Sequence, residues 1–414
     1  MIDDRPITES PLAVLKNRNF ALFWSGQLIS LVGSWMQALA QTWVVMSLTH
    51  TAFALGIVNF VSALPPALLM LHGGVAADKM DKRRILIVTQ CIFVAGAFTM
   101  AALVRSGRIQ LWHVMAMAVA LGFAVAFDLP ANQALTPELV DRRHIPSAVQ
   151  LNQAIFHGSR LIGPAIAGWL IGRFGSYSAF VANGISFIPV ILTLLIVRPV
   201  RVVQGRPAGG ALEAMREGLG YVKTRPRLKA MLLLTGLTTS IVFPNTVMLM
   251  PFYVKNVLHL GAAALGTTMS AGGGGAFLGS MALLIVPEDK RVSRIALGMI
   301  GLTGTLFGMA ALPSLHLHAA ANLAVACLGA AILGSAMASV GGLVATIIQQ
   351  SVPDQLRGRV MSLQSLVFLG VLPFASLIVS KAADALTLPR EMFVAAIVYA
   401  LCGFALFGRV ARED

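Results

Sequence analysis

Twelve long apolar segments dominate this sequence, and each is long enough to cross a lipid bilayer as a helix. A spanning helix needs about 20 mostly apolar residues, and its backbone groups must bond within the segment. The predicted spans of the first half are 20–48, 53–76, 85–104, 111–132, 149–172 and 178–197. Those of the second half are 230–253, 263–286, 295–313, 319–345, 360–380 and 391–408. The sequence therefore predicts an all-α membrane protein with twelve transmembrane helices.

The charged residues agree with this prediction and give the chain an orientation. Only 12% of the 414 residues are charged, about half the share of an average soluble domain, which argues against a soluble enzyme. Of the 31 Lys and Arg residues, 24 lie in loops and tails on the side of the N-terminus and 6 on the other side. Because basic loops stay in the cytoplasm, we expect a protein of the cytoplasmic (inner) membrane with both termini cytoplasmic. This distribution explains the net charge of +14 without a nucleic acid partner.

The longest connection, about 198–229, divides the spans six and six. We therefore expect an N-terminal half of residues 1–197, a cytoplasmic linker and a C-terminal half of residues 230–414. Apolar residues recur at helical spacing in the linker, which predicts a short amphipathic helix, more a tether than a regulatory site. They are Leu212, Met215, Leu219 and Val222.

The two halves also resemble each other in sequence. Ala54-Leu55-Gly56 opens the second span, and Ala264-Leu265-Gly266 opens the eighth at an offset of 210, which also takes Asp78 to Glu288. Parallel halves related by an axis along the membrane normal are the major facilitator arrangement. The sequence thus predicts two pseudo-symmetric six-helix halves.

The loop between spans 2 and 3 combines paired glycines, acids and a basic run. Gly73 and Gly74 permit close helix approach, and Asp78 can sit at a helix N-terminus or pair with a cation to hold the cytoplasmic side shut. The basic residues alone fit plain cytoplasmic loop charge. The candidate conformational lock consists of Gly74, Asp78, Lys79, Arg83 and Arg84, with Asp354, Arg357 and Arg359 in loop 10–11.

This loop resembles the loop 2–3 signature of the major facilitator superfamily, with Asp81 in place of the usual second glycine. Two further segments, Asn17 to Thr49 and Asp128 to Val140, resemble the enterobactin-exporter-like branch of that superfamily. The segment from Arg160 to Gly168, with its Gly163-Pro164 pair, resembles the Gly-Pro motif associated with exporters. The branch usually has arginine where Asn132 stands. The resemblance implies an exporter that works by rocking one half against the other.

Buried charge gives a clue independent of this resemblance. Asp128 is the one acid that we place inside a span, and intramembrane charge is a functional hypothesis by default. We expect Asp128 either to couple protons or to form a gate or helix-end contact. Arg160 near mid-span either holds an anionic group or bonds structurally to backbone carbonyls. His157 lies one turn before Arg160, and it either titrates or packs as a neutral side chain.

A polar stripe follows one face of the first span. Gln27, Ser30, Ser34, Gln37 and Gln41 recur at steps of three and four, which keeps them on one side of a helix. We expect Ser34, Gln37 and Gln41 to line a central substrate cavity, with Thr238 and Asn245 from the seventh span. Hydrogen bonding between helices is the alternative.

The sequence predicts a secondary active transporter, not an enzyme: proton-coupled export of a small amphiphilic, siderophore- or drug-like molecule. Uptake, lysolipid movement or a non-transporting membrane sensor are the alternatives. Gly272–Gly275 lacks the Lys-Ser/Thr of a nucleotide loop. The three cysteines have no metal-ligand spacing, and we expect them to be buried. We therefore expect no cofactor and no metal, and a monomer that meets lipid, protons and a small-molecule substrate.

Overall fold

The computed structural model describes residues 11–197 and 211–411, and within these ranges every regular element is helical. The first half contains six long helices. They are α1 (Arg18–Leu48), α2 (Ala52–Lys79), α3 (Lys82–Arg105), α4 (Leu111–Leu135), α5 (Ile145–Phe174) and α6 (Tyr177–Ile196). The short helices η1 (Pro11–Lys16), η2 (Thr136–Leu139) and η3 (Arg142–His144) lie between or before them. All six predicted spans of this half are confirmed as helices.

The second half also contains six membrane-length units. The first is a composite of α8 (Pro226–Leu237), η4 (Thr238–Val242), η5 (Pro244–Met248), α9 (Met250–Phe252) and η6 (Tyr253–Val257). The others are α10 (Ala262–Ala282), α11 (Arg291–Ala311), α12 (Ala319–Ser351), α13 (Asp354–Leu386) and α14 (Leu388–Ala411). The short helices η7 (Leu283–Ile285), η8 (Glu288–Lys290) and η9 (Leu312–Leu315) connect them.

Eleven of these units among the described residues are long and apolar enough to cross a membrane. The twelfth, α10, is rich in glycine and packs between α5 and α12. The described residues therefore form a multi-pass membrane protein with a helical unit at each of the twelve predicted spans. Cys91 and Cys402 are exposed, which corrects the expectation that they are buried, because their helix faces turn outward from the bundle.

The composite seventh span departs from a regular α-helix at three places. The segments η4, η5 and η6 are π-helical, and Pro244 and Pro251 stand near the starts of η5 and α9. Proline removes a backbone donor, and π-helical turns occur frequently at functional sites. The hydrophobic length of the segment predicted a span here but not this irregular backbone.

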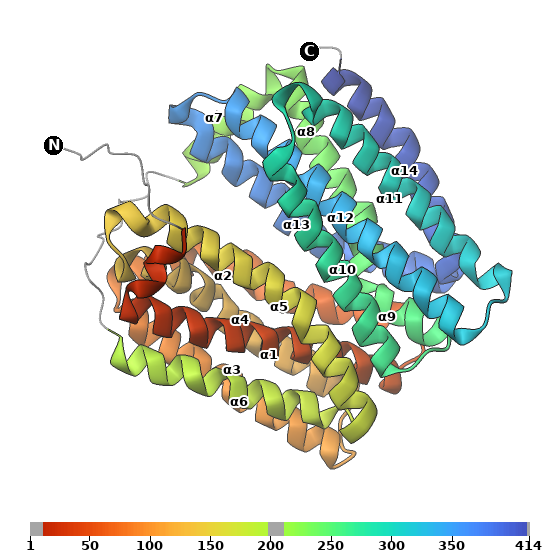
Figure 1. Cartoon of the computed structure of the whole chain (residues 1–414), viewed down its shortest axis with the longest axis horizontal. Helices are drawn as coiled ribbons and strands as arrows, with labels where there is room; N and C mark the ends of the chain where they lie inside the picture. The colour runs from red at the N-terminus through yellow and green to blue at the C-terminus, as the bar shows by residue number, and fades with distance from the viewer. Residues whose placement is uncertain (1–10, 198–210, 412–414) are drawn as a thin grey trace.

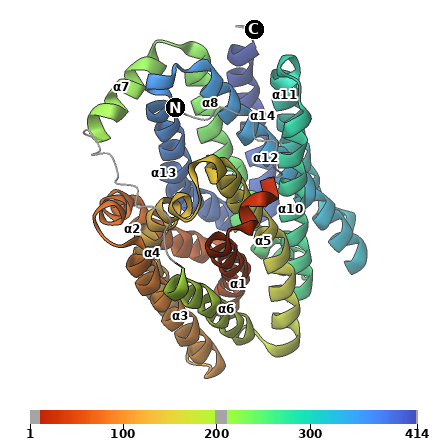
Figure 2. The ribbon, with the colours of Figure 1, turned by 60° about the vertical axis from the view of Figure 1, so that its left-hand side comes forward.

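The helices form two bundles that converge at one end and splay apart at the other (Figure 1). Helices α1–α6 form one bundle, and α8–α14 form the other. The turned view separates the two bundles again (Figure 2). The splayed end is the end at which α7 lies and at which α14 ends (Figure 1). We call the opposite, converging end the closed end.

Small residues let the bundles touch at the closed end. A Cβ added to Gly56 of α2 would overlap the Ser380 hydroxyl of α13, and one added to Gly168 of α5 would lie 2.9 Å from the Cα of Gly266 in α10. The Asp384 carboxylate also accepts hydrogen bonds from the backbone N–H groups of Ala52 (2.6 Å) and Phe53 (2.8 Å). It therefore caps α2 from the other half, where a carboxylate complements the helix dipole.

The linker contains helix α7 (Ala211–Lys223), at the position of the predicted amphipathic helix. Val222 is buried, and Gly218 packs against the backbone of Arg359 in α13. Glu217 forms an ion pair with Arg359. Helix α7 is therefore docked on the C-terminal half. The side chains of Leu212 and Met215 lie outside those that the structure describes.

Candidate functional site

A cavity of about 340 Å³ lies between the two bundles. Helices α1 and α5 supply one wall, and α8 with η4 and η5, α10, α12 and α13 supply the other. Aromatic, methionine and small aliphatic side chains dominate the lining, with three threonines and two basic groups. The polar and basic members are Thr235, Thr238, Thr239, His157 and Arg160. We call this the central cavity.

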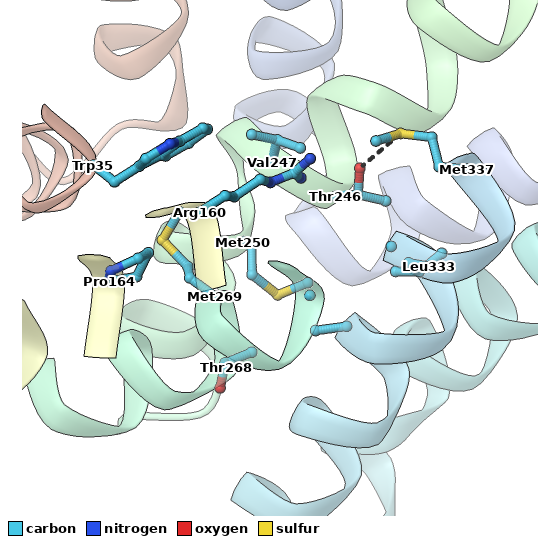
Figure 3. A pocket seen from close by; sticks show the side chains of 13 residues that line it. Trp35, Arg160, Pro164, Thr246, Val247, Met250, Thr268, Met269, Leu333 and Met337 are labelled. Atoms are coloured by element: carbon cyan, nitrogen blue, oxygen red, sulfur yellow. Dashed lines mark hydrogen bonds between the residues drawn. The ribbon is translucent and has the colours of Figure 1, made fainter. Parts of the chain in front are cut away.

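Arg160 lies at the boundary between the central cavity and a narrow constriction. The guanidinium carbon lies 5.7 Å from the centre of the Trp35 ring, and the side chain extends from α5 toward Val247 (Figure 3). The constriction beyond it has only about 30 Å³ of free space. Pro164, Met250 and Met269 line the constriction (Figure 3). Arg160 therefore marks the depth at which the space between the halves ends.

Asp128 lies in the N-terminal half, between two polar pockets of about 450 and 420 Å³. Its Oδ1 accepts hydrogen bonds from the Thr89 hydroxyl (2.6 Å) and the Gln90 amide (3.0 Å) of α3. Asp128 therefore bonds to α3, while Arg160 faces the central cavity. Phe156 lines both the first polar pocket, with Asp128, and the central cavity, with Arg160.

The polar stripe of α1 lines these two pockets. Ser34 borders both of them, and Gln37 and Gln41 border the second. The Asn183 amide of α6 donates to Gln37 Oε1 at 2.7 Å. The structure thus places Ser34, Gln37 and Gln41 around Asp128 inside the N-terminal bundle, and not in the central cavity with Thr238.

Thr238 and Asn245, the two candidates of the seventh span, have different surroundings. Thr238 lines the central cavity, and its hydroxyl lies 3.1 Å from that of Tyr399 in α14. Asn245 is fully buried and donates to Glu391 Oε1 at 3.3 Å. The expectation that Asn245 lines a cavity is wrong, because the π-helical turns direct its side chain toward α14.

Glu391 is a functional candidate that the sequence reasoning missed. It lies in the first turn of α14 and is 5% exposed. Asn245 Oδ1 and Glu391 Oε2 are both buried without a hydrogen-bond partner among the described residues. The expectation that Asp128 is the one membrane carboxylate is therefore wrong. The sequence signal that could have identified Glu391 was its position as the first residue of the last predicted span.

His157 lies in the central cavity with Arg160, on the same face of α5 as expected. Its ring packs edge-on against Phe156, with the ring centres 5.6 Å apart. The Nδ1 atom is buried and has no partner among the described residues. The cavity therefore contains two nitrogen-bearing side chains one helical turn apart.

The candidate lock in loop 2–3 makes its contacts inside its own half. Asp78 and Lys79 are exposed, and the Arg83 guanidinium donates to the backbone oxygens of Leu194 (2.9 Å) and Leu195 (3.1 Å) at the end of α6. Arg84 is exposed, and its Nε lies 3.9 Å from an oxygen of Asp81.

Two expectations about this loop need correction. A Cβ on Gly73 would overlap the Ala126 carbonyl of α4, whereas Gly74 has no neighbour within 4 Å. Close approach therefore requires Gly73 and not Gly74. Lys82 is not simple loop charge, because its Nζ lies 3.0 Å from Glu138 and the side chains are 8% and 3% exposed.

In loop 10–11, Arg357 and Arg359 are held by neighbouring segments. Arg357 Nε donates to the Gln349 carbonyl at 3.0 Å, and Arg359 pairs with Glu217 of α7. The side chain of Asp354 lies outside those that the structure describes. Within residues 11–197 and 211–411, no group of three His, Cys, Asp or Glu side chains is arranged to hold a metal ion.

Comparison with known proteins identifies the family. The model of the transmembrane secretion effectors, a major facilitator family, matches residues 9–412, and this chain belongs to that family. It is 26% identical to the staphyloferrin A transporter of Staphylococcus aureus, over 91% of this chain and 92% of that protein. It is 24% identical to macrolide efflux protein A of Streptococcus pyogenes, over 88% and 89%.

Solved structures of other transporters have the same fold. A mutant form of the nucleoside transporter NupG superposes with a TM-score of 0.75 at 13% identity, covering 95% of this chain and 99% of the other. The predicted major facilitator fold is confirmed.

Proposed function

We propose that this protein exports small amphiphilic molecules of the siderophore or drug type across the cytoplasmic membrane, as a monomer, by alternating access and in exchange for protons. The observation that carries the proposal is the central cavity between two bundles that touch at one end and splay at the other. Rocking of one half against the other around a fixed site is the expected mechanism for such halves. The names of the relatives support efflux as the direction.

The basic loops support the orientation. Among the described residues, the splayed end carries the basic loops 2–3 and 10–11 and helix α7, so the positive-inside rule assigns it to the cytoplasm. A substrate would then enter the central cavity from the cytoplasm or the inner leaflet. In the opposite state, loops 2–3 and 10–11 would approach each other, and Asp78, exposed here, would gain a partner in the C-terminal half.

Asp128 is our candidate for the proton site. A carboxylate inside the bilayer is costly unless it is functional or well bonded, and Asp128 faces two polar pockets that can supply water. The α1 residues Ser34, Gln37 and Gln41 border this region. Their position supports a role in proton access, with substrate contacts left to the residues of the central cavity.

Everted membrane vesicles test the proposal. With ethidium, Nile red and dansyl-aminoundecanoate as fluorescent amphiphiles, we expect at least one probe to accumulate when respiration energises the vesicles. A protonophore should abolish this accumulation, and vesicles without the protein should show none. Accumulation that survives the protonophore would contradict proton coupling. Binding of a probe without flux would favour a sensor, and flux only in right-side-out vesicles would favour uptake.

A further inference from the structure

Arg160 is a cation at the inner end of the central cavity. Neither the central cavity nor the adjoining constriction has an Asp or Glu among its described lining residues. The contact of Arg160 that the structure does provide is the face of the Trp35 ring, 5.7 Å away. The nearest membrane carboxylate by sequence, Asp128, is bonded to α3 instead.

An unpaired charge inside a bilayer protein is unfavourable, because it loses hydration without gaining a counter-charge. The attraction of the Trp35 ring offsets only part of this loss. The structural alternative, bonding of the guanidinium to backbone carbonyls near Pro164, is not what the geometry favours. The side chain extends away from α5 and toward Val247 of the other half (Figure 3). The site is therefore electropositive and incomplete without an anion.

His157 adds a second polar group to the same place. It lies one helical turn from Arg160 on the same face of α5 and lines the central cavity. A planar carboxylate can accept two parallel hydrogen bonds from a guanidinium, and a third from an imidazole N–H. An anion in the central cavity would therefore have Arg160 as its cation and His157 in the same lining.

The other residues that line the central cavity determine the chemistry of the non-anionic part of the ligand. Phe156, Phe243, Phe368 and Met337 present apolar surface, and the threonines supply weak polar contacts. A ligand that fills this space therefore needs an apolar or aromatic body joined to one anionic group. A metal-bound or highly charged polyanion does not match an apolar cavity with a single strong cation.

We propose that Arg160, assisted by His157, binds the anionic group of the transported molecule, and that the substrates are amphiphilic carboxylates. This inference rests on the proposed export function and names its substrate class. The position of Arg160 fits this role, because a Cβ on Gly273 of α10 would lie 2.6 Å from the Arg160 carbonyl. The anion therefore binds where the two halves meet.

A matched pair of ligands tests the inference on the purified full chain. The probes are dansyl-aminoundecanoate and its methyl ester, which differ in charge and share the apolar body. We expect wild-type protein to bind the acid about tenfold or more tightly than the ester, because hydrogen bonds to charged groups are the stronger class. Arg160→Gln should remove this preference and leave ester binding unchanged. Arg160→Lys should retain part of it.

Lys255→Gln is the control, because Lys255 is also a cation near a tryptophan, with its Nζ 4.7 Å from the Trp43 ring centre, but does not line the central cavity. It should keep the wild-type preference. Equal binding of acid and ester by wild type overturns the inference without any variant. An acid preference that survives in folded Arg160→Gln also overturns it. Export with no charge preference would support the transport proposal and overturn the anion site at Arg160. Charge-selective binding without flux would support the anion site and overturn the transport proposal.

Discussion

Gly273 of α10 faces the backbone carbonyl oxygen of Arg160 in α5, and a Cβ on Gly273 would lie 2.6 Å from that oxygen. The two halves thus meet at the same depth at which the central cavity ends. Toward the splayed end from this contact, the space holds about 340 Å³, and toward the closed end it narrows to about 30 Å³.

Replacing Gly273 by alanine should disfavour the conformation described here. Overpacking costs about 1–3 kcal/mol. We therefore expect the ratio of the two conformations to shift roughly 5- to 150-fold toward the opposite state, in which the bundles separate at the end where they now touch. Spin labels at Asp78→Cys and Gly358→Cys, in a background without the natural cysteines, would measure this shift as a shorter distance across the splayed end.

Gly272→Ala is the matched control, because a Cβ there would lie 3.5 Å from the Ala330 carbonyl oxygen, an ordinary contact. It should leave the distance distribution near that of wild type. Identical distributions for Gly273→Ala and wild type would show that this contact does not set the balance between states.

Removing one partner of the buried ion pair between Lys82 and Glu138 should strongly destabilise the protein, because it leaves the other charge buried and unpaired. The two side chains are 8% and 3% exposed, and removing one partner of a buried pair costs about 3–5 kcal/mol. Lys82→Ala should therefore lower the midpoint of thermal unfolding in detergent clearly. Arg84→Ala, whose side chain is 85% exposed, should change the free energy of unfolding by about 0.5 kcal/mol or less. Equal unfolding midpoints for Lys82→Ala and Arg84→Ala would contradict the prediction that loss of the buried pair is the more destabilising change.

Asn245 and Glu391 should behave as a bonded pair between the seventh and last spans. Asn245→Leu leaves the Glu391 carboxyl buried without its donor, which should cost about 1–3 kcal/mol. Glu391→Gln keeps an oxygen that accepts from the Asn245 amide and introduces no charge. The unfolding stability of this variant should therefore stay close to that of wild type. Thermal unfolding in the same detergent compares them, and an equal loss in both variants would contradict this prediction.

The twelve helices were predictable because bilayer thickness sets a minimum length for each apolar run. The structure extends several of them beyond the apolar run, for instance α12 to Ser351 and α13 to Leu386. The π-helical turns of the seventh span were not predictable, because they depend on packing against α13 and α14 and not on local hydrophobicity.

The errors at the site have a common physical origin. Sequence position indicates depth in the membrane but not the direction in which a side chain points. Lys82 and Glu391 stand at the ends of apolar runs, where charge is ordinary, and the tertiary fold buries both. Asn245 was assigned to the cavity from helical spacing, and the altered backbone of η5 turned it toward α14.

Proton movement by the Asp128→Asn variant tests the account most directly. Asparagine can still accept the hydrogen bonds of Thr89 and Gln90 but cannot take up a proton. In proteoliposomes with a trapped pH-sensitive dye, addition of a transported probe should drive protons across the membrane with wild type and with Glu288→Gln, an exposed loop control. Asp128→Asn should bind the probe and move no protons. Wild-type proton movement by Asp128→Asn would contradict the coupling mechanism.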